Sequence, residues 1–190
     1  VDIAKLPKVV PGMLVELRGE TVPGGYAPAI RPREIRVLGH ETLPPAQPAN
    51  LGDILTGVMD CQRAEWRGVV QHAQRGSGAK PSMQMHLAVP GQRFYFVVWD
   101  AGEWQPEQLV GAMVRLTAVT SAFFNERGEL VGARMQMNNF DSLTIEQPAP
   151  ADPFAVPEVP LRQLQSFAVR GPVLTRQRLA GTVTLCRAGD

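Results

Sequence analysis

Five stretches of alternating apolar and polar residues between residues 61 and 147 constrain the fold of this chain more than any other feature. In a β-strand every second side chain faces the same side, so a period-two pattern predicts strands with one buried face. The five runs are residues 64–70, 83–89, 93–99, 114–119 and 133–137, and the last resumes at 143–145. A short helical turn at 106–110, with Pro106 near its start and Gly111 at its end, separates the third run from the fourth.

The order of these elements is three strands, a short helix and two further strands, which is the order of an OB-fold, a five-stranded Greek-key barrel. We therefore predict an all-β fold with one complete OB-like barrel over residues 57–147, its helix lying between strands three and four. In the third run, Phe94, Phe96 and Val98 alternate with Tyr95, Val97 and Trp99. Because both sets are apolar, we expect both faces of this strand to be covered.

Parts of the same pattern occur again near both ends of the chain. Three pairs of segments match position for position: 12–19 with 111–118, 35–37 with 143–145, and 178–183 with 65–70. Repetition of one supersecondary pattern in this way indicates an internal repeat.

This repeat predicts how the chain is divided. Residues 1–39 are the C-terminal part of a preceding OB-like repeat, 40–56 a Pro-rich linker with a short helix, 57–147 the complete barrel, 148–170 a second Pro-rich linker with a short helix, and 171–190 the first strand of a following repeat. An isolated strand leaves backbone groups unpaired. We therefore expect residues 175–186 to pair with the N-terminal segment as a partial second barrel, or with another copy as a homodimer. Phe154 is expected to anchor the second linker in a groove of the barrel.

Composition argues against two classes of protein. The net charge of +1 over 190 residues argues against an electrostatic nucleic-acid binder, since such domains usually carry a basic stripe. No run of about 18 apolar residues occurs, so no segment reads as a transmembrane helix. Cys61 and Cys186 allow one disulfide, although two isolated buried thiols fit the pattern better. Because the chain begins at Val1, we expect a processed or excised piece of a longer protein.

No catalytic or metal-binding pattern emerges from the sequence. His40, His72 and His86 are scattered, with no cysteine or carboxylate at metal-ligand spacing. Neither a nucleophile elbow nor a phosphate-binding loop occurs. We therefore expect no catalytic residue, no metal site and no cofactor, and we expect His86 to be solvated on the outer face of the second strand.

Aromatic side chains are the strongest candidates for ligand binding. Tyr95 and Trp99 share one face of the third strand, and OB-folds that bind single strands stack bases on such side chains. Arginines at positions 93, 115 and 134 could face the same groove. The candidate ligand-binding residues are Tyr95, Trp99, Phe123, Phe124 and Arg115. The alternative, which a repeat array favours, is that these aromatics pack in a core or between neighbouring repeats.

Three short motifs carry a resemblance to a known family. They are Gln-Xaa-Xaa-Glu-Xaa-Xaa-Gly-Val-Val at residues 62–70, Phe-Asn-Glu at 124–126 and Pro-Ala-Asp-Pro-Phe at 150–154. Together they resemble the tandem OB-like repeats in the sensor regions of bacterial two-component histidine kinases and diguanylate cyclases. The resemblance implies an extracytoplasmic (periplasmic) part of a membrane-bound sensor, with a cytoplasmic location left open. Any kinase activity would lie in other parts of the parent protein.

Three functions therefore stay open. The first is a non-catalytic sensing or protein-interaction module of a larger bacterial signal-transduction protein, whose partners are the rest of that protein and a small ligand or protein. The second is an OB-fold binder of single-stranded nucleic acid or oligosaccharide, which needs a positive groove lined by exposed Tyr95 or Trp99. The third is a structural spacer. A sensor for a small ligand needs a concave, mostly apolar pocket. A spacer needs neither a positive groove nor an apolar pocket.

Overall fold

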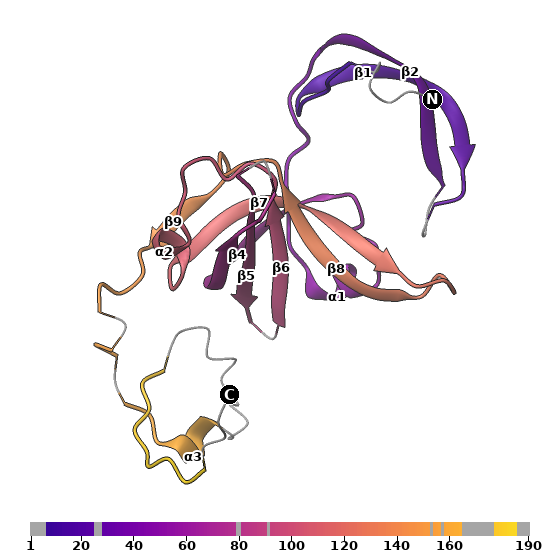
Figure 1. Ribbon diagram of the computed structural model, residues 1–190. Helices are drawn as coiled ribbons and strands as arrows, with labels where there is room; N and C mark the ends of the chain where they lie inside the picture. The colour runs from indigo at the N-terminus through magenta and orange to yellow at the C-terminus, as the bar shows by residue number, and fades with distance from the viewer. Residues whose placement is uncertain are drawn as a thin grey trace. The chain divides into compact units, whose positions relative to one another are not determined.

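The computed structural model describes residues 7–24, 28–78, 81–90, 92–152, 154–156, 158–164 and 177–185. Nine strands and three short helices lie in this part of the chain, so the predicted all-β class is confirmed (Figure 1). The chain divides into two compact units, one made of residues 1–64 with 119–133 and the other of residues 65–118 with 134–190.

The first unit contains a long antiparallel hairpin of β1 (Met13–Val22) and β2 (Ala29–His40), drawn in indigo and violet in Figure 1. The strand register shifts after Leu14 and again after Arg18. Several large apolar side chains of the hairpin remain exposed to solvent: Leu14, Leu17, Ile30, Val37 and Leu38. Both strands fall in the segment predicted to hold the last two strands of a repeat.

The first linker contains β3 (Gln47–Pro48) and α1 (Leu51–Leu55), which confirms the short helix predicted there. The Asn50 side chain caps α1 by accepting a hydrogen bond from the Gly52 N–H at 2.9 Å. Ile54 of this helix is 1% exposed, so α1 contributes a core side chain.

The remaining strands form one sheet in the order β3-β4-β5-β6-β8-β7-β9. Their bounds are β4 (Arg63–Arg75), β5 (Met83–Val89), β6 (Gln92–Val98), β7 (Met113–Phe124), β8 (Leu130–Met137) and β9 (Thr144–Gln147). β5 is antiparallel to β4 and β6, whereas β6 and β8 run parallel. A further pairing of β4 with β7 closes the sheet into a five-strand ring of β4, β5, β6, β8 and β7.

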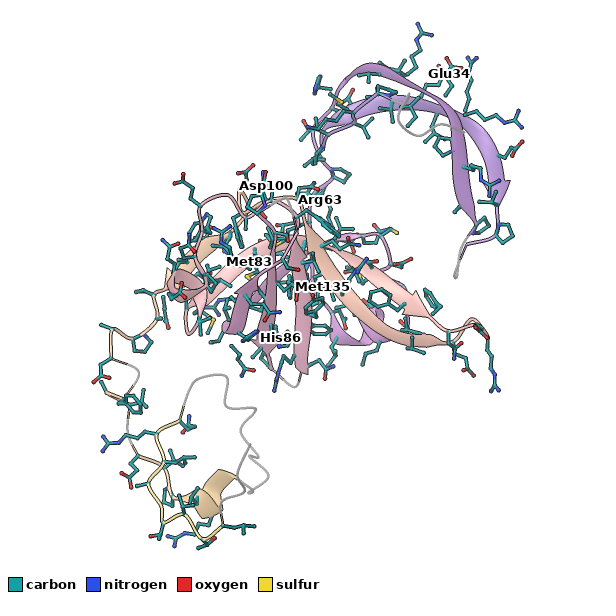
Figure 2. All side chains as sticks on the ribbon, in the orientation of Figure 1. Glu34, Arg63, Met83, His86, Asp100 and Met135 are labelled. Atoms are coloured by element: carbon teal, nitrogen blue, oxygen red, sulfur yellow. The ribbon has the colours of Figure 1, made fainter. Side chains whose placement is uncertain are left out.

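The interior of the ring in the second unit is filled by the inward residues of the alternating pattern. Trp66 packs edge-on against Phe94 and Phe96, with ring centroids 4.8 and 5.4 Å apart. Met83 and Met135, both labelled in Figure 2, are fully buried. Other side chains with at most 1% exposure include Met85, Leu87, Val98, Val114 and Leu116. These are the residues that the period-two pattern places inside, so the predicted core is confirmed.

Two further short helices lie where they were predicted. α2 (Pro106–Leu109) separates β6 from β7, and the Gln105 N–H donates a hydrogen bond to the side-chain oxygen of Gln108 at 2.7 Å. α3 (Leu161–Leu164) follows the second Pro-rich linker.

Three side chains are more exposed than expected. Trp99 is 48% exposed, so one end of the outward face of β6 is uncovered, although Val97 on the same face is buried. Phe154 is 71% exposed and therefore does not anchor the linker in a groove. Cys61 is free and exposed rather than buried, and it has a left-handed backbone conformation with φ of 58°. Trp99 follows the last residue of β6, Phe154 lies in the second linker, and Cys61 lies in the turn before β4.

The C-terminal segment forms no strand within residues 177–185, where one parallel bridge joins Arg178 to Glu158. The rest of residues 171–190, including Cys186, lies outside the described residues. The expected pairing of residues 175–186 with the N-terminal segment or with another copy therefore stays a prediction.

Candidate binding face

Outward side chains of four neighbouring strands line up in rows across the sheet of the second unit. The strand register pairs His72 with His86, His86 with Tyr95, and Tyr95 with Arg134. The next row, two residues away along each strand, contains Gln74, Gln84, Val97 and Gln136. We call these two rows together with Trp99 the outer face.

Side-chain contacts connect the members of the outer face. The His86 ring, labelled in Figure 2, lies between the rings of His72 and Tyr95, at centroid distances of 5.6 and 5.7 Å. The Gln74 amide donates a hydrogen bond to Gln84 Oε1 at 2.9 Å, and the Trp99 indole N–H donates to the side-chain oxygen of Gln136 at 3.2 Å. Cross-strand contacts of this kind hold neighbouring side chains in register. The outer face is therefore an ordered set of rings and amides.

The charge of the outer face is neutral to positive, because neither row contains Asp or Glu. Burial lowers the pKa of His86 below its ordinary value of 6.5, and the nearby charges of His72 and Arg93 lower it further. His86 is thus neutral at pH 7, with one ring nitrogen that donates a hydrogen bond and one that accepts. Arg134 supplies a permanent positive charge at the end of the row.

This arrangement suits a ligand with a planar or apolar surface and polar edges. Tyr95 and Trp99 offer aromatic surface for stacking, and Trp99 is 48% exposed. The glutamine amides offer both donors and acceptors. A neutral ring or sugar, or an anionic group near Arg134, is compatible with these side chains, because the two rows contain no carboxylate.

The sequence pattern predicted Tyr95 and Trp99 for this face and an outward His86, but it did not predict His72 beside His86. Strict alternation from Ala64 would point position 72 inward. The register of β4 against β5 shifts between Val70 and His72, and an extra residue there reverses the direction of every later side chain. Ala73 is accordingly buried, and His72 faces outward beside His86.

Arg115 lies outside the outer face, in contact with carboxylates of two other strands. Its Nε lies 3.3 Å from Glu146 Oε1, while Arg67 Nε lies 2.6 Å from the other carboxylate oxygen of Glu146. Glu65 lies 4.0 Å from Arg115 as well. These residues of β4, β7 and β9 form an ion-pair network in which Glu146 neutralises two arginines, so Arg115 is committed to a structural contact.

Phe123 and Phe124 lie at the end of β7, among the residues of the first unit. Phe123 is 39% exposed. Phe124 is partly buried, and its ring lies near Gly57, where an added Cβ would stand 3.7 Å from Phe124 Cζ. The two phenylalanines are thus assigned to a different unit from Tyr95 and Trp99, and they are no part of the outer face.

The described residues show neither a cluster of metal ligands nor a long apolar helix. Within the described ranges, no group of three or more His, Cys, Asp or Glu side chains is arranged to hold a metal ion. None of the helices in the described part of the chain is both long and apolar enough to cross a bilayer.

This chain resembles known proteins in structure rather than in sequence. No family model and no curated protein matches the sequence. Among solved structures, the chain is similar to an aspartyl tRNA synthetase from Entamoeba histolytica, with 14% sequence identity and a TM-score of 0.41. The likeness covers 79% of this chain and 30% of the synthetase chain, so this chain spans less than a third of the synthetase.

Proposed function

We propose that the five-strand ring is an OB-like barrel and that the chain is a non-catalytic binding module. The ring order β4-β5-β6-β8-β7, closed by β4 with β7, follows the order one-two-three-five-four of a Greek-key barrel with its third and fifth strands parallel. α2 lies between the third and fourth strands, as the sequence pattern requires. In OB-folds the face of strands two and three binds ligands, and here that face carries His86, Tyr95 and Trp99.

The observation that carries the proposed function is the outer face itself. Rows of aromatic, histidine and glutamine side chains on a sheet face, without a carboxylate, are poorly explained by folding alone. Exposed aromatic side chains ordered by hydrogen bonds are typical of surfaces that bind a partner.

The resemblance of the sequence motifs to sensor regions supports a role in a larger bacterial signalling protein of the sensor histidine kinase type. In this proposal the chain is an extracytoplasmic sensing or protein-interaction module, and the partners of the outer face are a small ligand or another protein. Catalysis then belongs to other domains of the parent protein.

A second candidate is a binder of single-stranded nucleic acid or oligosaccharide. The observation that favours it is the position of Tyr95 beside Arg134, with Trp99 four residues further along the same strand face, because stacked aromatics with positive charge at their edge recognise nucleotides. Glutamine amides beside an exposed Trp99 fit sugar hydroxyls equally well.

Fluorescence anisotropy of dye-labelled probes tests these proposals, because the label reports binding in a variant without Trp99 as well as in the wild type. The full chain is titrated into labelled oligothymidine and into a labelled neutral oligosaccharide, each at low and high salt. The variants are Trp99→Ala and, as a matched control, Phe154→Ala, which removes an exposed aromatic outside the outer face.

Salt-sensitive binding of oligothymidine that Trp99→Ala abolishes and Phe154→Ala retains would establish the nucleic-acid candidate in place of the sensor. Salt-insensitive binding of the oligosaccharide that Trp99→Ala abolishes and Phe154→Ala retains would establish a carbohydrate module. If neither probe binds, cross-linking at a photoreactive residue in place of Gln84 to a purified fragment of the parent protein tests the protein-interaction role. No cross-link at position 84 together with no ligand would refute a binding role for the outer face.

A further inference from the structure

The hairpin β1–β2 repeats the strand pair β7–β9 in its backbone register, not only in its sequence. Val15 pairs with Val37 as Val114 pairs with Ile145, and a register shift comes directly before Val15 and Val114 in the two strands. The adjoining pairs agree as well: Leu14 with Gly39 and Glu16 with Arg36 in the hairpin, Met113 with Gln147 and Arg115 with Thr144 in the ring.

The residues that lead into the two strands also agree. Gly12 and Gly111 have positive φ values of 89° and 93°, a conformation that favours glycine. Each glycine lies in a turn that is closed by the equivalent hydrogen bond, from the Met13 N–H to the Val10 carbonyl at 3.2 Å and from the Ala112 N–H to the Leu109 carbonyl at 2.9 Å. β1 is therefore built as the counterpart of β7.

β7 has a strand partner that β1 lacks within the described residues. β4 runs antiparallel to β7: the Val70 N–H donates to the Ala112 carbonyl at 3.0 Å, and the Gly111 N–H donates to the Val70 carbonyl at 2.7 Å. β1 belongs to a sheet of two strands, and Leu17, the counterpart of the buried Leu116, is 40% exposed. An unpaired strand edge beside exposed apolar side chains is a template for a strand from another chain.

We propose that β1 binds the C-terminal segment, residues 177–185, of a second copy of this chain as an antiparallel strand. Residues 178–183 match residues 65–70 of β4, so Val183 takes the place of Val70 and Leu179 that of Trp66. The register of β4 against β7 then sets Val183 opposite Met13 and Leu179 opposite Leu17.

The C-terminal segment has the features that this role requires. Leu179 is 42% exposed and Val183 is 79% exposed. When the segment adopts a strand conformation, these two side chains share one face, with Gly181 between them. β4, the counterpart of the C-terminal segment, pairs with β3 as well as with β5 and β7. The bridge of Arg178 to Glu158 is therefore compatible with pairing of the same segment to β1. A second copy thus supplies main-chain hydrogen bonds and an apolar cover for Val15 and Leu17, which is recognition by strand addition.

Light scattering coupled to gel filtration tests the proposal on the full chain over a range of concentrations. The wild type is expected to self-associate as concentration rises. Val183→Lys, which alters the inserted strand, and Leu17→Lys, which alters its receptor, are each expected to weaken self-association about tenfold or more. The matched control is Val131→Lys, since Val131 is 64% exposed in β8 and takes no part in the contact.

Hydrogen exchange separates this arrangement from pairing within one chain. Protection of the amides of β1 is expected to rise with concentration in the wild type and to stay low in Val183→Lys. A chain that remains monomeric at every concentration would overturn the proposal. So would equal loss of association in Val131→Lys, or protection of β1 that does not depend on concentration.

Discussion

The hairpin β1–β2 and the strand pair β7–β9 use the same register, the same leading glycine and the same register shift, yet their side chains meet different surroundings. Val114 and Leu116 in β7 are 0% and 1% exposed, whereas Leu17 in β1 is 40% exposed. The backbone register of a strand pair thus follows from the residues of the two strands themselves. The burial of their side chains depends on further strands from elsewhere in the chain. Stability should differ between the two regions even where the residues match, and substitutions at matched positions measure this difference.

The largest expected difference comes from shortening the matched leucines. Leu116→Ala should lower the free energy of unfolding by about 2 to 5 kcal/mol, because it leaves a cavity in a closed core. Leu17→Ala should change it by less than about 0.5 kcal/mol, since that side chain is already partly in water. Denaturant unfolding followed by tryptophan fluorescence measures the effect, because Trp66 is buried in the ring. Equal losses would show that the hairpin has a covered core of its own.

Thr21 and Thr120, each two residues beyond the matched segments 12–19 and 111–118, provide a smaller effect of opposite sign. Thr120 is 1% exposed, and its hydroxyl finds no hydrogen-bond partner in the part of the chain that the structure describes. Thr120→Val should therefore raise the free energy of unfolding by about 1 kcal/mol, because an unpaired buried hydroxyl is replaced by a methyl group. Thr21→Val, at the exposed counterpart in β1, should leave stability unchanged. A loss of stability in Thr120→Val, seen by thermal unfolding, would indicate a hydroxyl partner such as bound water.

The ion pairs of the two regions differ less. Glu146 contacts Arg67 and Arg115 and its side chain is 23% exposed, whereas Glu16 contacts Arg18 with its side chain 37% exposed. Glu146→Gln should cost about 0.5 to 1 kcal/mol, and Glu16→Gln less than that, because solvent screens the more exposed pair. Adding salt should shrink both losses. A larger loss for Glu16→Gln would reverse the comparison.

The smallest effect concerns pH. Since the pKa of His86 is lowered in the folded ring, the unfolded chain binds more protons than the folded chain as pH falls below 6.5. The contribution of His86 to stability is therefore present above that pH and is lost as pH falls. The free energy of unfolding of the wild type and of His86→Gln is measured by denaturant unfolding at about pH 7.5 and about pH 5.5. Relative to His86→Gln, the wild type should lose slightly more stability at the lower pH. A stability difference that grows at low pH would mean that the pKa is raised instead.

The sequence predicted the strands and helices well because they depend on local patterns. Period-two alternation located β5 within the same residues, and proline with a following glycine located α2. The outer face was predicted only in part. A one-residue register shift after Val70 turns His72 outward, and such a shift depends on the partner strand rather than on the residues before it. Likewise, Arg115 was expected in a groove, but the position of Glu146 on β9 decides its contact.

The pairing of β4 with β7 has a consequence for how the protein folds. The Thr120 N–H donates to the Gln62 carbonyl, so closing the ring joins residues that are far apart along the chain, and the entropy lost in that closure precedes most of the packing gained. The hairpin β1–β2 joins near neighbours and should form within about 1 to 10 μs, as isolated hairpins do. The hairpin β1–β2 therefore becomes ordered before the five-strand ring. Until the ring has folded, the exposed apolar side chains and the unpaired edge of the hairpin are accessible to other chains.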